Sequence, residues 1–272
     1  MSDSIGWLQA VFLALIQGFT EFLPISSSAH LALVPLVSAW EDQGLAFDCI
    51  VHWGTLTAIV YYFRSDLALM RTGLGETVKQ RNWKANRDGQ MAWMILFATI
   101  PAGIIGLAFK DFIESDLRSV AVIGWASIGF GLLLWVADKS GRQKRTDKDW
   151  TLNDALIVGL LQSIALIPGT SRSGITMTGA LLLGYTREAA ARFSFLLSIP
   201  VIFLAGGLKI IEWIETPEQV AGPSALIIGF VGSAISAYIC VHYFLKFLNQ
   251  MGMGPFVVYR VILGSVLLWM VW

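Results

Sequence analysis

The chain has 272 residues, of which 56% are hydrophobic and only 14% are charged. Soluble domains carry about 25% charged residues, so this composition excludes an ordinary soluble protein and predicts an integral membrane protein. The 19 basic and 19 acidic residues balance, and nothing in that charge suggests a nucleic-acid partner. Cys49 and Cys240 both lie in apolar runs, which favours buried free thiols over a disulfide or a metal site.

The first apolar segment, Ile5–Ile16, is too short to cross a hydrocarbon core of about 30 Å, which needs about 20 residues. The polar stretch Gln17–His30 interrupts it, and apolar character resumes over Leu31–Val37. Irregular backbone at membrane depth is tolerated only where protein or a water-filled cavity surrounds it. We therefore expect a re-entrant helical hairpin with a buried break, although two full spans would satisfy the loop charges equally well.

The rest of the first half contains three apolar segments long enough to be full spans. A polar loop rich in Lys and Arg, Arg64–Gln90, separates the first from the second, and a short acidic connection, Asp111–Asp116, separates the second from the third. The expected spans are Phe47–Phe63, Met91–Phe109 and Val120–Val136.

The second half repeats this plan after a second basic loop, Asp138–Trp150. The apolar segment Leu152–Ile167 is broken by the polar stretch Pro168–Thr176 and continued by Met177–Leu183, which predicts a second re-entrant hairpin. Three further spans are expected at Phe193–Ile211, Ala225–Phe247 and Phe256–Trp272.

The distribution of charged loops orients these spans. Cytoplasmic loops carry an excess of Lys and Arg, so Arg64–Gln90 and Asp138–Trp150 are expected in the cytoplasm. The acidic segments Asp111–Asp116 and Glu212–Glu218 then lie on the opposite side, together with both termini.

The expected fold is an all-α polytopic membrane protein with six transmembrane helices plus two re-entrant helical hairpins. Each half holds a hairpin and three spans, and an odd number of spans makes the second half enter the membrane inverted relative to the first. We expect one membrane domain, residues 1–272, with a first inverted repeat over 1–137, a second over 151–272, and a cytoplasmic linker over 138–150. In this architecture the two broken helices meet and form a site.

The first break contains residues that could bind a cation. Gln17 and Glu21 are four positions apart, which places them on one face of a helix. Amide and carboxylate oxygens suit Mg²⁺ or Ca²⁺ when water and a substrate phosphate complete the coordination. On spacing alone, a Glu21 that caps a helix or pairs with Arg172 inside the bundle is the favoured interpretation.

The serines after Pro24 suggest a phosphate site. Ser26, Ser27 and Ser28 can cap the next helix, and a helix N-terminus in a cavity attracts phosphate. His30 lies three residues after Ser27, within reach of its hydroxyl across one turn. A serine nucleophile needs such a base, but capping serines beside a structural histidine are supported about equally by the spacing.

The second break adds Arg172, a charge inside an apolar segment whose planar guanidinium suits phosphate oxygens. Gly169 and Gly174 would let the backbone approach an anion closely. An ion pair with Glu21 is the alternative, and both can hold at once. His52 and His242 are lone histidines in apolar spans for which structural roles are favoured, although His52 could border the site.

Together the two breaks resemble the motifs of one bacterial family. Gln17–His30 is similar to the (E/Q)xxxE…SS…H motif of the undecaprenyl-diphosphate phosphatases, the bacitracin-resistance family, and Pro168–Thr176 is similar to their PGxSRSxxT motif. The resemblance covers essentially the whole chain, and two long motifs in register make it specific. It implies hydrolysis of undecaprenyl diphosphate to undecaprenyl phosphate and inorganic phosphate, which recycles the lipid carrier for cell-wall synthesis and confers bacitracin resistance.

The resemblance also implies a setting and a cofactor. The protein would lie in the bacterial inner membrane among membrane lipids, with its site facing the periplasm and a divalent cation, Mg²⁺ or Ca²⁺, bound there. A homodimer is left open.

Transferred residue by residue, the resemblance assigns Glu21 and Gln17 to the metal and Ser27 to attack on the terminal phosphorus, with Glu21 among the catalytic residues. His30 would take up the serine proton or activate water. The diphosphate would be bound by the remaining motif side chains, Ser26, Ser171, Arg172, Ser173 and Thr176. Many family members have Glu where this chain has Gln17, and one fewer negative charge should weaken metal binding.

Two other classes of function compete with this reading. A lipid-phosphate flippase or secondary transporter could use the same inverted repeats, Arg172 and helix N-termini, but it would not need a serine–histidine pair beside a carboxylate. A structural membrane protein would leave Glu21, His30 and Arg172 without a reason to be buried.

Overall fold

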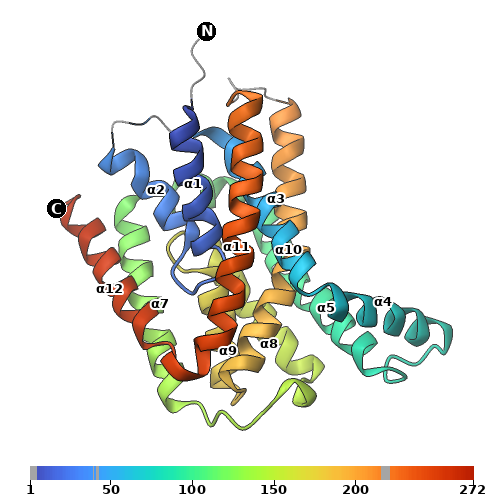
Figure 1. The fold of residues 1–272 in the computed structure, drawn as a ribbon. Helices are drawn as coiled ribbons and strands as arrows, with labels where there is room; N and C mark the ends of the chain where they lie inside the picture. Colours follow the sequence, from blue (N-terminus) through green and yellow to red (C-terminus); the bar gives the residue numbers. More distant parts are fainter. Residues whose placement is uncertain (1–4, 39, 41–42, 216–220) are drawn as a thin grey trace.

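The computed structural model describes residues 5–38, 40, 43–215 and 221–272, and the regular structure of these residues is helical apart from one isolated bridge between Arg145 and Tyr185 (Figure 1). Five of the described helices are long and apolar enough to cross a membrane by length and composition: α3 (Gly44–Tyr62), α5 (Arg87–Ala108), α7 (Val120–Ser140), α10 (Arg187–Glu215) and α11 (Pro223–Met251). The chain is therefore an all-helical, polytopic membrane protein, as its composition predicts.

The shorter apolar helices include the two interrupted segments and the last expected span. They are α1 (Trp7–Thr20), α2 (Ser27–Val37), α8 (Leu152–Gln162) extended by the 3₁₀ turn η2 (Ser163–Leu166), and α12 (Gly254–Trp269). The sixth expected span, Phe256–Trp272, corresponds to α12, whose 16 residues are shorter than the five long helices. At 1.5 Å per residue, such a helix covers roughly 24 Å of a core about 30 Å thick.

Helices also occupy parts of the chain that we expected to be loops. The first basic loop is largely helix α4 (Arg64–Lys79), which packs along the start of α5. Gly73 and Gly89 make this packing close, because a Cβ on either glycine would lie 2.4 Å from the backbone of the other. The prediction of a loop from this polar sequence was wrong, because an amphipathic helix needs no long apolar run.

Two smaller differences concern the connections. The acidic segment forms the short helix α6 (Lys110–Ser115). Asp138, expected to open the second basic loop, belongs to α7, where it forms a buried ion pair with Arg187 at 2.6 Å. The rest of that loop contains one 3₁₀ turn, η1 (Asp147–Asp149).

The two breaks repeat each other in their backbone. Helix α2 begins at Ser27 and α9 (Arg172–Leu182) begins at Arg172, 145 positions later (27 to 172), and each helix has 11 residues. Each is preceded by a serine with positive φ, 72° at Ser26 and 69° at Ser171. Such a conformation costs a non-glycine residue about 1–3 kcal/mol, and it concentrates at functional sites.

Helices from the two halves of the chain pack against each other. The interrupted helix α1 lies on α11, and α8 lies on α5. Helix α3 also contacts α10, and α7 contacts α12, so further contacts join helices of the two halves. In Figure 1 the two breaks lie inside this bundle, while α4 projects from it.

Candidate active site

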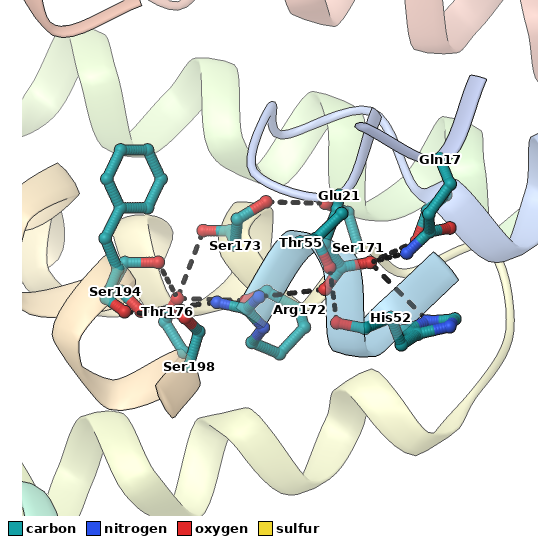
Figure 2. Close-up of polar contacts among 12 residues, drawn as sticks. Gln17, Glu21, His52, Thr55, Ser171, Arg172, Ser173, Thr176, Ser194 and Ser198 are labelled. Atoms are coloured by element: carbon teal, nitrogen blue, oxygen red, sulfur yellow. Dashed lines mark hydrogen bonds and ion pairs between the residues drawn. The ribbon is translucent and has the colours of Figure 1, made fainter. Parts of the chain in front are cut away.

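The Glu21 carboxylate is the centre of the polar site, immediately after the end of α1. Its Oε2 atom accepts hydrogen bonds from the Ser27 hydroxyl at 2.7 Å and from the Gln17 amide at 3.0 Å. Its Oε1 atom accepts one from the Arg172 guanidinium at 3.0 Å. Figure 2 shows how Gln17 of α1 and Arg172 of α9 reach Glu21. A carboxylate with only 8% exposure is tolerated here because an opposite charge and several donors surround it.

Arg172 faces Glu21 because it is the first residue of α9, directly after the strained Ser171. Its other terminal nitrogen donates to the backbone carbonyl of Ser194 on α10 at 3.2 Å. The ion pair therefore joins the first break to the second, and both Ser27 and Arg172 contact one carboxylate. This is the convergence predicted from the inverted-repeat hypothesis.

The serines before the two helices act as caps. The Ser26 hydroxyl accepts from the Ala29 amide at 3.4 Å, and the Ser171 hydroxyl accepts from the Gly174 amide at 3.2 Å. Each also lies 3.1 to 3.2 Å from the hydroxyl two residues later, Ser28 or Ser173. The capping predicted for the serines after Pro24 is therefore confirmed at Ser26, and Ser171 caps the second break in the same way.

Ser173 and Thr176 use their hydroxyls within the protein. Ser173 donates to the Leu23 carbonyl at 2.9 Å, which links the two breaks a second time. Thr176 lies 2.7 Å from the Ser194 hydroxyl and also donates to backbone carbonyls of its own helix, as Figure 2 shows. These contacts support the site around Arg172 and leave direct substrate binding by either residue as a prediction.

A cavity of about 770 Å³ begins at this polar cluster. Glu21, Ser27, His52 and Arg172 line one part of it, and side chains of α5 and α10 form largely apolar walls. Other lining residues lie at the ends of α5 and α10 and on α6: Leu107, Lys110, Ile113, Glu212 and Glu215. A polar end with long apolar walls fits an amphiphile that has a charged head and a hydrocarbon tail.

No hydrogen bond joins His30 to Ser27 among the described residues, which agrees with the alternative of a structural histidine beside capping serines. Its Nδ1 atom lies 2.7 Å from the Ser26 carbonyl, and its Nε2 atom lies 2.5 Å from the hydroxyl of Tyr259 on α12. The Ser27 hydroxyl instead turns back to Glu21, because Ser27 is the first residue of α2 and faces the end of α1. His30 thus anchors α2 to α12, and its proposed role in proton transfer remains a prediction.

Two further residues belong to the site or its support. His52 of α3, for which a structural role was favoured, lines the cavity with Nε2 at 3.7 Å from the Glu21 carboxylate. Arg260 of α12 was not singled out at all, although an arginine in an apolar span is a costly feature that could have marked it.

Arg260 is fully buried and donates only to backbone carbonyls among the described residues. Those acceptors include Pro24 in the first break at 3.5 Å and Gly169 in the second at 3.0 Å. Its side chain therefore ties the two breaks together from the side of α7 and α12.

The residues at Glu21 fit a cation held mainly by substrate and water. The described residues contain no cluster of three or more His, Cys, Asp or Glu side chains able to bind a metal. Mg²⁺, however, commonly uses one or two carboxylates together with phosphate oxygens and water. Glu21 supplies a carboxylate, and the adjacent Gln17 has a buried Oε1 atom without a hydrogen-bond partner in the described part of the chain.

Comparison with known proteins places this geometry in a family. The model of the bacitracin resistance protein BacA family matches residues 10–266. The chain belongs to this family. It is 53% identical over 264 residues to "Undecaprenyl-diphosphatase 2" of Stutzerimonas stutzeri, covering 96% of this chain and 97% of that protein. It is 54% identical over 268 residues to the undecaprenyl-diphosphatase of Saccharophagus degradans, covering 97% and 98%.

Family membership confirms the resemblance drawn from the two motifs. The match extends over both breaks and over the long helices, so the motifs do not occur here on an unrelated scaffold.

Proposed function

We infer that this protein is an undecaprenyl-diphosphatase that releases inorganic phosphate from undecaprenyl diphosphate and so contributes to bacitracin resistance. Relatives with that activity in their names match nearly its full length. The observation that carries the chemistry is the Ser27 hydroxyl, which donates to Glu21 at the polar end of a cavity with apolar walls. The hydrocarbon chain of the lipid would follow those walls toward the surrounding membrane lipids.

We propose that Ser27 is the nucleophile and Glu21 its base. The serine Oγ attacks the terminal phosphorus while its proton passes to Glu21 Oε2, the atom to which it is already hydrogen bonded. The bond between that phosphorus and the bridging oxygen breaks, and undecaprenyl phosphate leaves. Water then hydrolyses the serine–phosphate bond and inorganic phosphate is released.

In this proposal Arg172 binds the phosphate oxygens. Its guanidinium already faces an anion, Glu21, and its fork geometry suits two oxygens at once. Helices α2 and α9 both begin at the site, so their N-termini add partial positive charge there. Phosphoryl transfer is catalysed mainly by positioning and neutralisation of charge, which is what these groups supply.

A divalent cation fits the same proposal. Glu21, with Gln17 beside it, would hold Mg²⁺ or Ca²⁺ together with phosphate oxygens of the substrate and water. When bound, the ion would neutralise part of the diphosphate charge.

We further propose two inverted repeats, residues 1–137 and 151–272, with α1–α2 and α8–α9 as re-entrant hairpins. Support comes from the matching breaks and from the exchange of contacts, in which α1 packs on α11 while α8 packs on α5. The site would face the periplasm of a bacterial inner membrane. The cavity-lining residues Lys110, Glu212 and Glu215 support that side, because they lie by the acidic segments expected to be outside the cytoplasm.

The decisive experiment is phosphate release from a C55 prenyl diphosphate by purified protein, with Ser27→Ala as the matched control. We expect release by the wild type and little or none by Ser27→Ala, which loses only one hydroxyl. A lipid-phosphate flippase is the competing function. It would move the lipid across a vesicle membrane without releasing phosphate, and that outcome would overturn the hydrolase assignment.

A further inference from the structure

The second break contains a buried amide that has nothing to bind in the protein. Gln162 is the last residue of α8 and is only 2% exposed, yet neither its Oε1 nor its Nε2 atom has a hydrogen-bond partner among the described residues. It also lines the cavity that contains Glu21 and Arg172. A buried amide without a hydrogen-bond partner is destabilising, so a group of this kind at a cavity wall indicates a missing ligand.

The first break shows what an amide in this position does. Gln162 follows Gln17 by 145 positions (17 to 162), the same offset that relates Ser26 to Ser171 and Ser27 to Arg172. Gln17 donates to the carboxylate of Glu21, four residues later. The residue four positions after Gln162 is Leu166, so the second break provides no carboxylate for the equivalent amide.

Charge decides which group could replace that carboxylate. By the same offset, Gln162 corresponds to Gln17, and Arg172 corresponds to Ser27. An anion drawn to Arg172 would therefore present oxygen acceptors near the free amide, as the Glu21 carboxylate does near Gln17. Because Gln162 is neutral, it can donate to that anion without adding charge to the wall.

We propose that Gln162 is a substrate-binding residue whose Nε2 atom donates a hydrogen bond to a phosphate oxygen of the diphosphate held by Arg172. This rests on the proposed function and adds a residue outside both sequence motifs. In the substrate complex, a phosphate oxygen accepts the hydrogen bond for which the side chain of Leu166 provides no acceptor.

The test compares Gln162→Leu with wild type in two measurements. Because the amide binds only the ligand, its removal should lower kcat/KM for prenyl diphosphate hydrolysis by roughly 10- to 100-fold. The thermal midpoint of the ligand-free protein should stay the same or rise, since an unpaired polar group is replaced by an apolar one. Ser163→Ala is the matched control. Ser163 is the next residue in the chain and has a buried hydroxyl without a hydrogen-bond partner among the described residues, but it does not line the cavity.

A second variant gives a readout that a structural role would not move. Gln162→Glu has the same size, but its ionised carboxylate can only accept hydrogen bonds and repels phosphate. Protonation restores a donor, so the ratio of its kcat/KM to that of wild type should rise as pH falls from about 8 to about 5. A flat ratio would count against the proposal.

Binding of a non-hydrolysable farnesyl diphosphonate separates this inference from the proposed function. Wild type should gain thermal stability from this ligand, and Gln162→Leu should gain less. If wild type releases no phosphate, the proposed function fails, and the diphosphonate shift still tests Gln162. Full kcat/KM in Gln162→Leu, or lost activity together with a lower thermal midpoint and an undiminished ligand shift, would overturn the inference. Gln162→Met serves the same comparison if the Leu variant does not fold.

Discussion

Glu21 illustrates how one side chain can serve both structure and chemistry. It accepts hydrogen bonds from Gln17 and Ser27 and forms an ion pair with Arg172, so it holds the two breaks together. In the proposed mechanism, the same contacts would place a base at the serine hydroxyl and the Arg172 guanidinium next to it. Removal of its charge should therefore affect catalysis and the position of Arg172 at once.

The first prediction concerns this charge. Glu21→Gln keeps the size of the side chain but should lower kcat by at least about 10³-fold, because general base catalysis contributes 10²- to 10⁴-fold and Arg172 loses its partner. Arg172→Lys should lower kcat/KM by roughly 10²-fold, since an ammonium cannot match the planar fork. An assay of phosphate release measures the kcat and kcat/KM of both variants. Near-normal turnover in either variant would show that the substituted residue has no catalytic role.

The second prediction concerns Gln17. Gln17→Glu adds a negative charge beside Glu21 and should lower the divalent-cation concentration needed for half-maximal rate. A titration with Mg²⁺ and with Ca²⁺ measures this concentration. An unchanged titration curve would place Gln17 outside the coordination of the ion.

At the scale of elements, Arg260 is the residue that fixes the geometry of both breaks. Its guanidinium donates to the Pro24 and Gly169 carbonyls, and the Gly169 carbonyl also accepts from the Ser127 hydroxyl of α7. Gly174 leaves room for this side chain, because a Cβ there would lie 2.8 Å from the guanidinium. The last helix thus positions the site without lining the cavity described here.

The third prediction follows from these contacts. Arg260→Met should leave the buried Pro24 carbonyl without its donor and remove one of the two donors of the Gly169 carbonyl, which lowers the thermal midpoint and reduces kcat at least about 10-fold. Arg260→Lys should recover part of both quantities, because an ammonium can still donate to some of these carbonyls. Arg64→Met is the control, since Arg64 is an exposed arginine outside the bundle. Normal kcat in Arg260→Met would show that the breaks keep their geometry without this side chain.

The sequence predicted the elements that depend on local patterns. Proline, serine and glycine that interrupt apolar runs located both breaks, and the cap at Ser26 followed from the same chemistry, whereas the cap at Ser171 was not predicted. Helix α4 was missed because its sequence is polar, and Arg260 was missed because its partners are carbonyls from distant segments. The spacing of Ser27 and His30 left a catalytic pair and a structural histidine equally supported, because it could not show the tertiary hydrogen bond from His30 to Tyr259.

At the scale of the whole molecule, the exchange of contacts between halves makes the orientation of one half dependent on the other. Helix α1 packs on α11, and α8 packs on α5, so each break is enclosed partly by helices of the opposite half. Two inverted halves would place the basic segments at one surface and the acidic segments at the other.

The fourth prediction tests that orientation. Arg118→Cys and Lys148→Cys place thiols at exposed positions on the two expected sides, while the native Cys49 and Cys240 are buried. In intact bacterial cells whose outer membrane is permeable to the reagent, a maleimide that cannot cross the inner membrane should label the Arg118→Cys thiol. It should label the Lys148→Cys thiol only after that membrane is opened. The reverse pattern would place the cavity mouth in the cytoplasm.

The pairing of Glu21 with Arg172 also has a consequence for biosynthesis. Glu21 precedes its cationic partner Arg172 by 151 positions, so this carboxylate has no partner yet when the ribosome has just finished the first half. Helix α11, on which α1 packs, and Arg260, which holds both breaks, are made later still. Long-range contacts of this kind form late, so the active centre should be among the last parts of the protein to assemble. A chain that stops before α12 would contain every residue of both sequence motifs and still lack the arginine that holds them in place.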